Sequence, residues 1–140
     1  MDKRLKELKV SDVMTDTVYT ANLDHSWNDV ARKMSAKNIH HIVIIDENNL
    51  PQSIISTSDF LSFALNADSK TLSKKLRDTI SKRRLITVHP ESNAYDAANL
   101  MNDHNVASIV VVNEKNQLVG IVSPKDLMNE ILFEDEPIDS

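Results

Sequence analysis

The chain has 140 residues, 41% of them apolar, which is enough for one compact domain or for two small repeats that share a core. Its formal net charge of −5 argues against nucleic acid as a partner, because nucleic-acid-binding domains present a basic face. The absence of cysteine excludes disulfides, thiolate metal sites and a cysteine nucleophile. No signal peptide or membrane span is predicted, because no long apolar run follows the charged start, so we expect a cytoplasmic protein without a membrane partner.

The organising feature is an internal repeat with a period of 67 residues. Residues 20–60 align with 87–127 without a gap, and 12 of the 41 aligned positions are identical. The identical pairs are Thr20/Thr87, Asp29/Asp96, Ala31/Ala98, Met34/Met101, Asn38/Asn105, Ile42/Ile109, Val43/Val110, Glu47/Glu114, Asn49/Asn116, Ile54/Ile121, Ser56/Ser123 and Asp59/Asp126. A long period that occurs twice predicts two copies of one supersecondary unit packed face to face, rather than a solenoid.

Each copy is predicted to run strand, helix, strand, strand, helix. In the first copy a short strand over about 17–21 precedes a helix, and two later runs, 41–45 and 53–56, predict strands. The first helix carries apolar residues at i, i+3, i+4 and i+7, namely Trp27, Val30, Ala31 and Met34. The second helix carries Phe60, Leu61 and Ala64. Trp27 is therefore expected in the core rather than as a platform for a base.

The second copy repeats this order, with strands predicted over 85–88, 108–112 and 118–122. Its two helices carry Ala94, Ala97, Ala98 and Met101, and then Leu127, Met128, Ile131 and Leu132. The fold class is accordingly α/β (α+β), built from two β-α-β-β-α repeats. Gly120 is the only glycine of the chain, so we expect there either a positive φ or a close approach of another segment.

This arrangement resembles a tandem pair of CBS domains (the domain named for cystathionine β-synthase), also called a Bateman module. The resemblance rests on the leader VSDVM at 10–14 and its weaker echo LRDTI at 76–80, on VYT at 18–20 and ITVHP at 86–90, and on LVGIVSPKDL at 118–127. It implies two repeats, 8–66 and 76–133, packed with pseudo-twofold symmetry into one compact module. A linker helix over 67–75 and an acidic tail over 134–140 complete the expected organisation.

The resemblance also implies a ligand. Members of the family bind AMP, ADP, ATP, S-adenosylmethionine or other adenosine derivatives in two clefts between the repeats. Each cleft is expected to join the Thr of one copy to the Ser-x-x-Asp of the other: Thr20 with Ser123 and Asp126, and Thr87 with Ser56 and Asp59. AMP, ADP or ATP is the expected ligand here, and S-adenosylmethionine is the alternative.

The Ser-x-x-Asp pattern has two interpretations. A carboxylate accepts hydrogen bonds at both oxygens, so one Asp can hold both ribose hydroxyls. The same spacing is a helix capping box, and Ser26-x-x-Asp29 shows it at a place where we expect capping alone. Both roles can coexist at one site. We expect the Asp126 cleft to be the better one, because Ser53 brings a side chain to the position that Gly120 holds in the second copy.

Basic side chains are candidate phosphate contacts. His40 and His41 directly precede a buried strand, where family members often meet phosphates, and protonation near a pH of about 6.5 would strengthen their hydrogen bonds. Lys125 stands beside Asp126, and residues 82–84 form a basic run. The alternative for all of them, ordinary solvated or interface side chains, stays open.

The leading functional hypothesis is a non-catalytic module that senses the nucleotide and transmits its occupancy to a regulated protein in trans. By the resemblance we expect a homodimer in which two modules form a disc. The alternative is a protein-interaction or dimerisation module whose clefts are vestigial. An enzyme is not expected, because the chain has no G-x-S-x-G elbow, no glycine-rich phosphate loop and no H-E-x-x-H metal helix. The remaining histidines show no ligand spacing, so no metal or other cofactor is expected.

Overall fold

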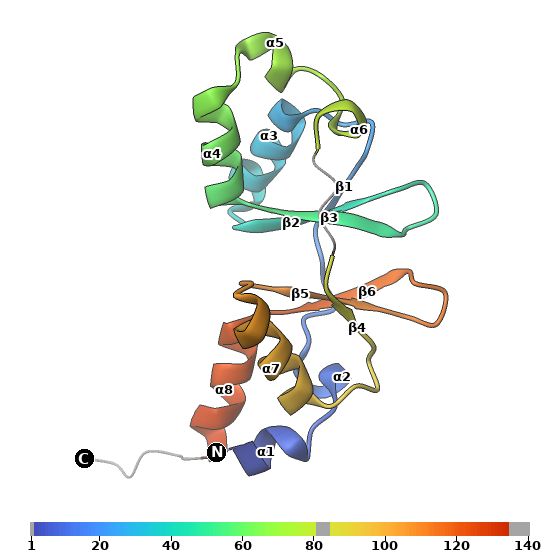
Figure 1. Ribbon diagram of the computed structural model, residues 1–140, viewed down its shortest axis with the longest axis vertical. Coiled ribbons are helices and arrows are strands. Elements are labelled where there is room, and N and C mark those ends of the chain that lie inside the picture. The colour runs from blue at the N-terminus through green and yellow to red at the C-terminus, as the bar shows by residue number, and fades with distance from the viewer. Residues whose placement is uncertain (1, 81–84, 135–140) are drawn as a thin grey trace, which may run out of the picture. The chain divides into compact units, whose positions relative to one another are not determined.

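The structure is a computed structural model that describes residues 2–80 and 85–134 (Figure 1). The chain divides into two compact units. The first-repeat unit comprises Val18–Leu85, and the second-repeat unit combines Met1–Thr17 with Ile86–Ser140. The acidic tail beyond residue 134 and the basic run at 82–84 lie outside the described residues.

The first-repeat unit is a three-stranded sheet with helices on one face (Figure 1). Strand β1 (Thr20–Asn22) lies parallel to β2 (His41–Ile45), and β2 lies antiparallel to β3 (Pro51–Ser56). Helix α3 (Trp27–Lys37) makes the crossover that the parallel pair requires. The remaining helices are α4 (Thr57–Asn66), α5 (Ser69–Leu72) and α6 (Leu76–Thr79).

The second-repeat unit has the same sheet. Strand β4 (Thr87–Val88) lies parallel to β5 (Ile109–Val112), which lies antiparallel to β6 (Leu118–Val122). Its helices are α7 (Ala94–His104) and α8 (Pro124–Glu134), joined by α1 (Asp2–Lys6) and α2 (Val10–Val13) from the start of the chain. The register also repeats: β2 and β5 each shift against their antiparallel partner at the same place, Ile44/Ile45 and Val111/Val112. The predicted mixed α+β class and element order are confirmed.

The backbone conformation explains two of the asparagine pairs that are identical between the repeats. Asn38 and Asn105 end helices α3 and α7 with a φ of 51°. Asn49 and Asn116 occupy the hairpin turns with φ values of 63° and 62°. Asparagine tolerates this left-handed conformation better than most residues other than glycine. These two identical pairs are therefore structural: they supply the left-handed conformation at helix ends and turns in a chain with a single glycine.

Each short leader helix packs in the unit formed by the other repeat. The backbone N–H groups of Val10 and Ser11 in α2 donate to the carbonyls of Ser92 and Pro90, at 2.7 and 2.9 Å. Those of Leu76 and Arg77 in α6 donate to His25 and Leu23 at the equivalent places, again at 2.7 and 2.9 Å. The spatial units therefore cross the boundaries of the repeats in the sequence, because each leader completes the core of the other copy.

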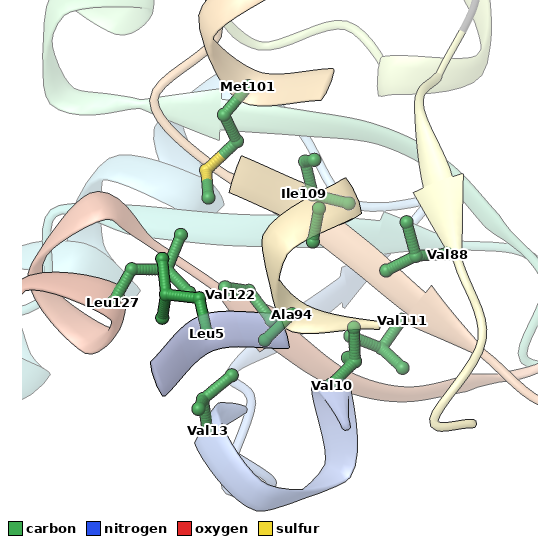
Figure 2. Packing of buried hydrophobic residues seen from close by; sticks show 11 residues of the cluster. Leu5, Val10, Val13, Val88, Ala94, Met101, Ile109, Val111, Val122 and Leu127 are labelled. Atoms are coloured by element: carbon green, nitrogen blue, oxygen red, sulfur yellow. The ribbon is translucent and has the colours of Figure 1, made fainter. Parts of the chain in front are cut away.

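The core of the second-repeat unit shows this directly (Figure 2). Leu5, Val10 and Val13 of the first segment lie among the side chains of β4, β5, β6, α7 and α8. Val10 is 0% exposed, and so is Leu76 in the core of the first-repeat unit. Each core therefore depends on a leader residue that precedes, in the sequence, the other repeat and not the repeat whose strands it covers.

The single glycine is explained by close packing and not by its own conformation. Gly120 lacks a positive φ. A Cβ at Gly120 would lie 2.7 Å from Sδ of Met14 and 3.1 Å from the carbonyl oxygen of Thr15. The leader passes directly over β6, where the backbones of Thr15 and Ile121 exchange hydrogen bonds of 2.9 and 3.0 Å. Of the two reasons expected for this glycine, the close approach is the right one.

Candidate functional site

The first-repeat unit contains a cavity of about 610 Å³. It lies along β3 and α4 and reaches the segment that holds α5 and α6, all shown in Figure 1. Its lining combines aromatic, hydroxyl and carboxylate side chains, among them Trp27, Ser53, Asp59, Phe63, Asp68 and Thr79. Ser53, which the sequence suggested as an obstacle to a ligand at Asp59, lines this cavity without closing it.

Asp59 sits at this cavity and also caps α4. Its Oδ2 accepts a hydrogen bond from the Ser56 N–H at 2.9 Å, and Ser56 Oγ accepts one from the Asp59 N–H at 3.0 Å. Ser26 and Asp29 make the same reciprocal pair at 2.9 and 3.1 Å, but Asp29 is not among the residues that line the cavity. Among the described residues, none donates a hydrogen bond to Oδ1 of Asp59. Among the described residues, capping therefore engages one oxygen of this carboxylate, and Asp59 also lines the cavity.

Asp126 has a different environment. Its Oδ2 accepts hydrogen bonds from the N–H and the hydroxyl of Ser123, at 2.8 and 3.0 Å. Its Oδ1 accepts one from the hydroxyl of Thr15 at 3.3 Å. Both oxygens thus have partners within the second-repeat unit. Sequence reasoning missed Thr15, which lies directly after the VSDVM leader.

The two adjacent histidines lie at the start of α4. His41 pairs with Ser56 across β2 and β3, and the carbonyl of His40 accepts a hydrogen bond from the Thr57 N–H at 3.0 Å. The pKa of His41 is lowered from its ordinary value by burial and by the neighbouring His40, against the opposing charge of Asp59. The structure therefore brings both histidines together with Ser56 and Asp59, while their contact with phosphate stays a prediction.

The two threonines fall in different units. Thr20 is half-buried in β1, and its carbonyl accepts a hydrogen bond from the Lys33 ammonium. Thr87 is exposed in β4, and Lys125 is exposed in the first turn of α8. The predicted pairing of each threonine with a Ser-x-x-Asp joins residues of the two units, so the pairing stays a prediction.

Trp27 is confirmed as a core residue, with 6% of its surface exposed. Its ring stacks on Phe63, with centroids 4.0 Å apart and planes inclined by 13°, and its Nε1 donates to the hydroxyl of Thr79 at 2.9 Å. Both rings also line the cavity. Phe63 was not predicted as a site residue, although its position four residues after Asp59 places it on the same face of α4.

Two further findings concern the described residues alone. Between residues 2 and 80 and between 85 and 134, no three histidine or carboxylate side chains are grouped so that they could hold a metal ion. Over the same stretches, none of the helices has the length and apolar character that crossing a membrane requires.

Comparison with known proteins decides the family. The model of the CBS domain matches this chain twice, over residues 10–66 and 76–133. The chain belongs to the CBS domain family. The CBS domain pair of protein MJ0100, solved in complex with 5′-methylthioadenosine and S-adenosyl-L-methionine, superposes with a TM-score of 0.75 at 26% identity and covers 89% of this chain and 99% of its own.

Relatives include longer proteins in which a CBS pair is one part. An uncharacterized protein of Methanocaldococcus jannaschii is 31% identical over 127 residues, 91% of this chain and 40% of that protein. A homoserine O-acetyltransferase of Methanococcoides burtonii is 29% identical over 88% of this chain and 24% of the enzyme. This chain therefore corresponds to less than half of the length of either relative.

Proposed function

We propose that this CBS pair is a non-catalytic regulatory module that binds an adenosine-containing ligand and passes its occupancy to a partner protein. The observation that carries the proposal is the cavity of about 610 Å³ with Asp59 on its wall. The related CBS pair of MJ0100, which was solved with two adenosine derivatives, supports the class of ligand.

The chemistry at Asp59 suits a ribose. Vicinal hydroxyls are hydrogen-bond donors, and the carboxylate of Asp59, which lines the cavity, is an acceptor. The first backbone N–H groups of α4 add a positive field at the same place. Asp126 is the second candidate, where a ligand has to displace or join the Thr15 hydroxyl. Thr20 and Thr87 complete the two sites in this proposal, with His40, His41 and Lys125 as contacts for any phosphate.

We further propose that the module acts as a homodimer on its partner in trans. Leu61 and Leu65 on α4 are 59% and 75% exposed, and Met128 at the equivalent position of α8 is 55% exposed. Apolar side chains that repeat on one helix face and remain exposed favour burial against another protein surface. The same observation favours the second candidate function, an interaction module whose cavities bind nothing.

A thermal-stability screen tests the proposal. We expect AMP, ADP, ATP or S-adenosylmethionine, but not GTP, to stabilise the protein. A ligand at a hundred times its Kd contributes about 2.7 kcal/mol, which raises the Tm of a domain of this size by roughly 5–15 °C.

Matched variants separate binding from capping. Asp59→Ala and Asp126→Ala each remove a capping carboxylate at a candidate site, whereas Asp29→Ala removes an equivalent cap away from the cavity. We expect the ligand-induced shift to survive Asp29→Ala and to be lost in at least one of the other two variants. The absence of any shift for the wild type would favour the interaction module instead.

A further inference from the structure

We propose that helix α1 (Asp2–Lys6) is a releasable strap, which an ion pair to α8 holds closed over one side of the second-repeat unit. The strap opens locally while the rest of the module stays folded, and its opening uncovers the side of α7 and α8 on which it lies. Opening is a property of the fold, so the proposal goes beyond the proposed function and holds whether or not the module binds a nucleotide.

Helix α1 occupies in the second-repeat unit the place that α5 occupies in the first. The two helices begin one 67-residue period apart, at Asp2 and Ser69. Leu5 and Leu72 each pack on the core of their own unit. Helix α5 lines the cavity of the first-repeat unit through Thr71, and α1 lies beside α7 and α8 (Figure 1). The two helices therefore cover equivalent sides of the two units.

An ion pair crosses the side that α1 covers. In the first-repeat unit, Phe63 of α4 and Thr71 of α5 line the cavity from two different helices. One period away, these positions hold Glu130 of α8 and Arg4 of α1, and the Glu130 Oε2 and the Arg4 Nη2 are 3.1 Å apart. Glu130 follows Asp126 by four residues, so the two lie on the same face of α8. The ion pair therefore holds α1 against the face of α8 that carries Asp126.

The other contacts of α1 also come from single side chains. Leu5 is 5% exposed and is the residue of α1 that lies in the core. The Lys6 ammonium lies 4.7 Å from the centre of the Tyr95 ring, and the Asn93 side-chain amide donates a hydrogen bond of 2.7 Å to the Lys6 carbonyl. A helix of five residues is not stable alone, so α1 is helical only while these contacts hold it.

The next helix, α2, is held more firmly. Val10 of α2 is 0% exposed, and the backbone of α2 donates hydrogen bonds to the carbonyls of Ser92 and Pro90. In contrast, the side chains that form the ion pair of α1 are 40% exposed at Arg4 and 24% exposed at Glu130, so dissolved salt screens their attraction. We therefore expect α1 to open at a lower free energy than α2, and salt to favour the open form.

Thiol labelling measures this opening. The chain has no cysteine, so one introduced thiol is a specific reporter. Leu5→Cys places it in α1, and Val10→Cys is the matched reporter in α2. The labelling rate with N-ethylmaleimide, an uncharged reagent, is compared with the rate that global unfolding of the same variant predicts from urea denaturation. We expect labelling of Leu5→Cys to exceed that rate by at least about tenfold, and Val10→Cys to be labelled at about that rate.

A second substitution assigns the effect to the ion pair. In the Leu5→Cys background, Glu130→Gln should accelerate labelling about two- to fivefold at low salt, the range expected for an exposed ion pair. Raising NaCl from about 0.05 to about 0.5 M should accelerate labelling by a similar factor while Glu130 is present, and much less in Glu130→Gln. Glu91→Gln removes the ion pair of 2.7 Å between Lys9 and Glu91, beside α2, and should leave the labelling of Leu5→Cys unchanged.

Two results would overturn the strap. Labelling of Leu5→Cys at the rate of its own global unfolding would mean that α1 opens only with the whole fold. Equal rates and equal salt responses with Glu130 and with Gln at this position would mean that the ion pair does not hold α1 closed. The labelling needs no ligand, so an accelerated rate together with a thermal screen in which no nucleotide stabilises the protein would support the strap and contradict the proposed function.

Discussion

At the scale of single residues, one carboxylate can serve the fold and the ligand at once. Asp59 uses Oδ2 to cap α4 and also lines the cavity. Asp126 caps α8 in the same way through Oδ2, and its Oδ1 accepts a hydrogen bond from Thr15, which lies 111 residues away along the chain.

His41 is expected to make stability fall in mild acid. Its pKa in the folded protein is lowered by burial and by His40, so below the ordinary value of 6.5 the unfolded chain takes up this proton more readily than the folded one. Stability should therefore fall as the pH drops through about 6.5. We expect His41→Gln to reduce the slope of Tm against pH between 7.5 and 5.5, as measured by thermal melts. An unchanged slope would show that other groups cause the acid response.

At the scale of elements, the two four-residue leader helices contribute to the core of each unit and therefore to the stability of the fold. Helices α2 and α6 are too short to be stable alone, and each is held by packing into the other copy. Both have a fully buried side chain, Val10 and Leu76, at equivalent places. The exchange couples the folding of the two repeats, because neither copy has a complete core without the other's leader.

We expect Leu76→Ala to destabilise the protein by about 2–5 kcal/mol, through lost burial and the cavity left behind. Lys74→Ala, at an exposed position two residues earlier, should change stability by less than about 0.5 kcal/mol. Urea denaturation followed by circular dichroism measures both. A small effect of Leu76→Ala would mean that α6 is not part of the cooperative core.

At the scale of the whole molecule, the proposed output is self-association and contact with a partner. The exposed side chains of Leu61 and Leu65 are four residues apart, so they lie on one face of α4. Met128 continues the same residue pattern in α8. The sequence alone would assign these apolar side chains to the core, but in the structure they are exposed.

We expect the wild type to form dimers at micromolar concentration and the double variant Leu61→Glu, Leu65→Glu to be monomeric. Burying two carboxylates at an apolar interface is costly, so association should weaken by at least about a hundredfold. Sedimentation equilibrium measures the constant, and Lys115→Glu in the exposed turn between β5 and β6 is the control. A wild type that stays monomeric at every concentration, with and without nucleotide, would contradict the dimer.

The sequence by itself determined the repeat, the order of the strands and helices, the capping boxes and the family. The elements and the capping boxes depend on residues within a few positions of one another, where helical periodicity, β-branched runs and Ser-x-x-Asp spacing are sufficient. The repeat and the family follow from comparing residues 67 positions apart, which needs no knowledge of contacts. Even the core position of Trp27 followed from its spacing to Val30 and Met34.

Only the tertiary structure decided which leader completes which core, why a side chain at Gly120 would crowd Met14 and Thr15, and which distant hydroxyl reaches Asp126. Each of these depends on contacts between distant segments, such as Met14 with Gly120 or Trp27 with Thr79. A repeat in the sequence predicts two similar units. It does not predict that Phe63 stacks on Trp27 whereas Glu130, at the equivalent position, forms an ion pair with Arg4. That difference depends on neighbours from distant parts of the chain.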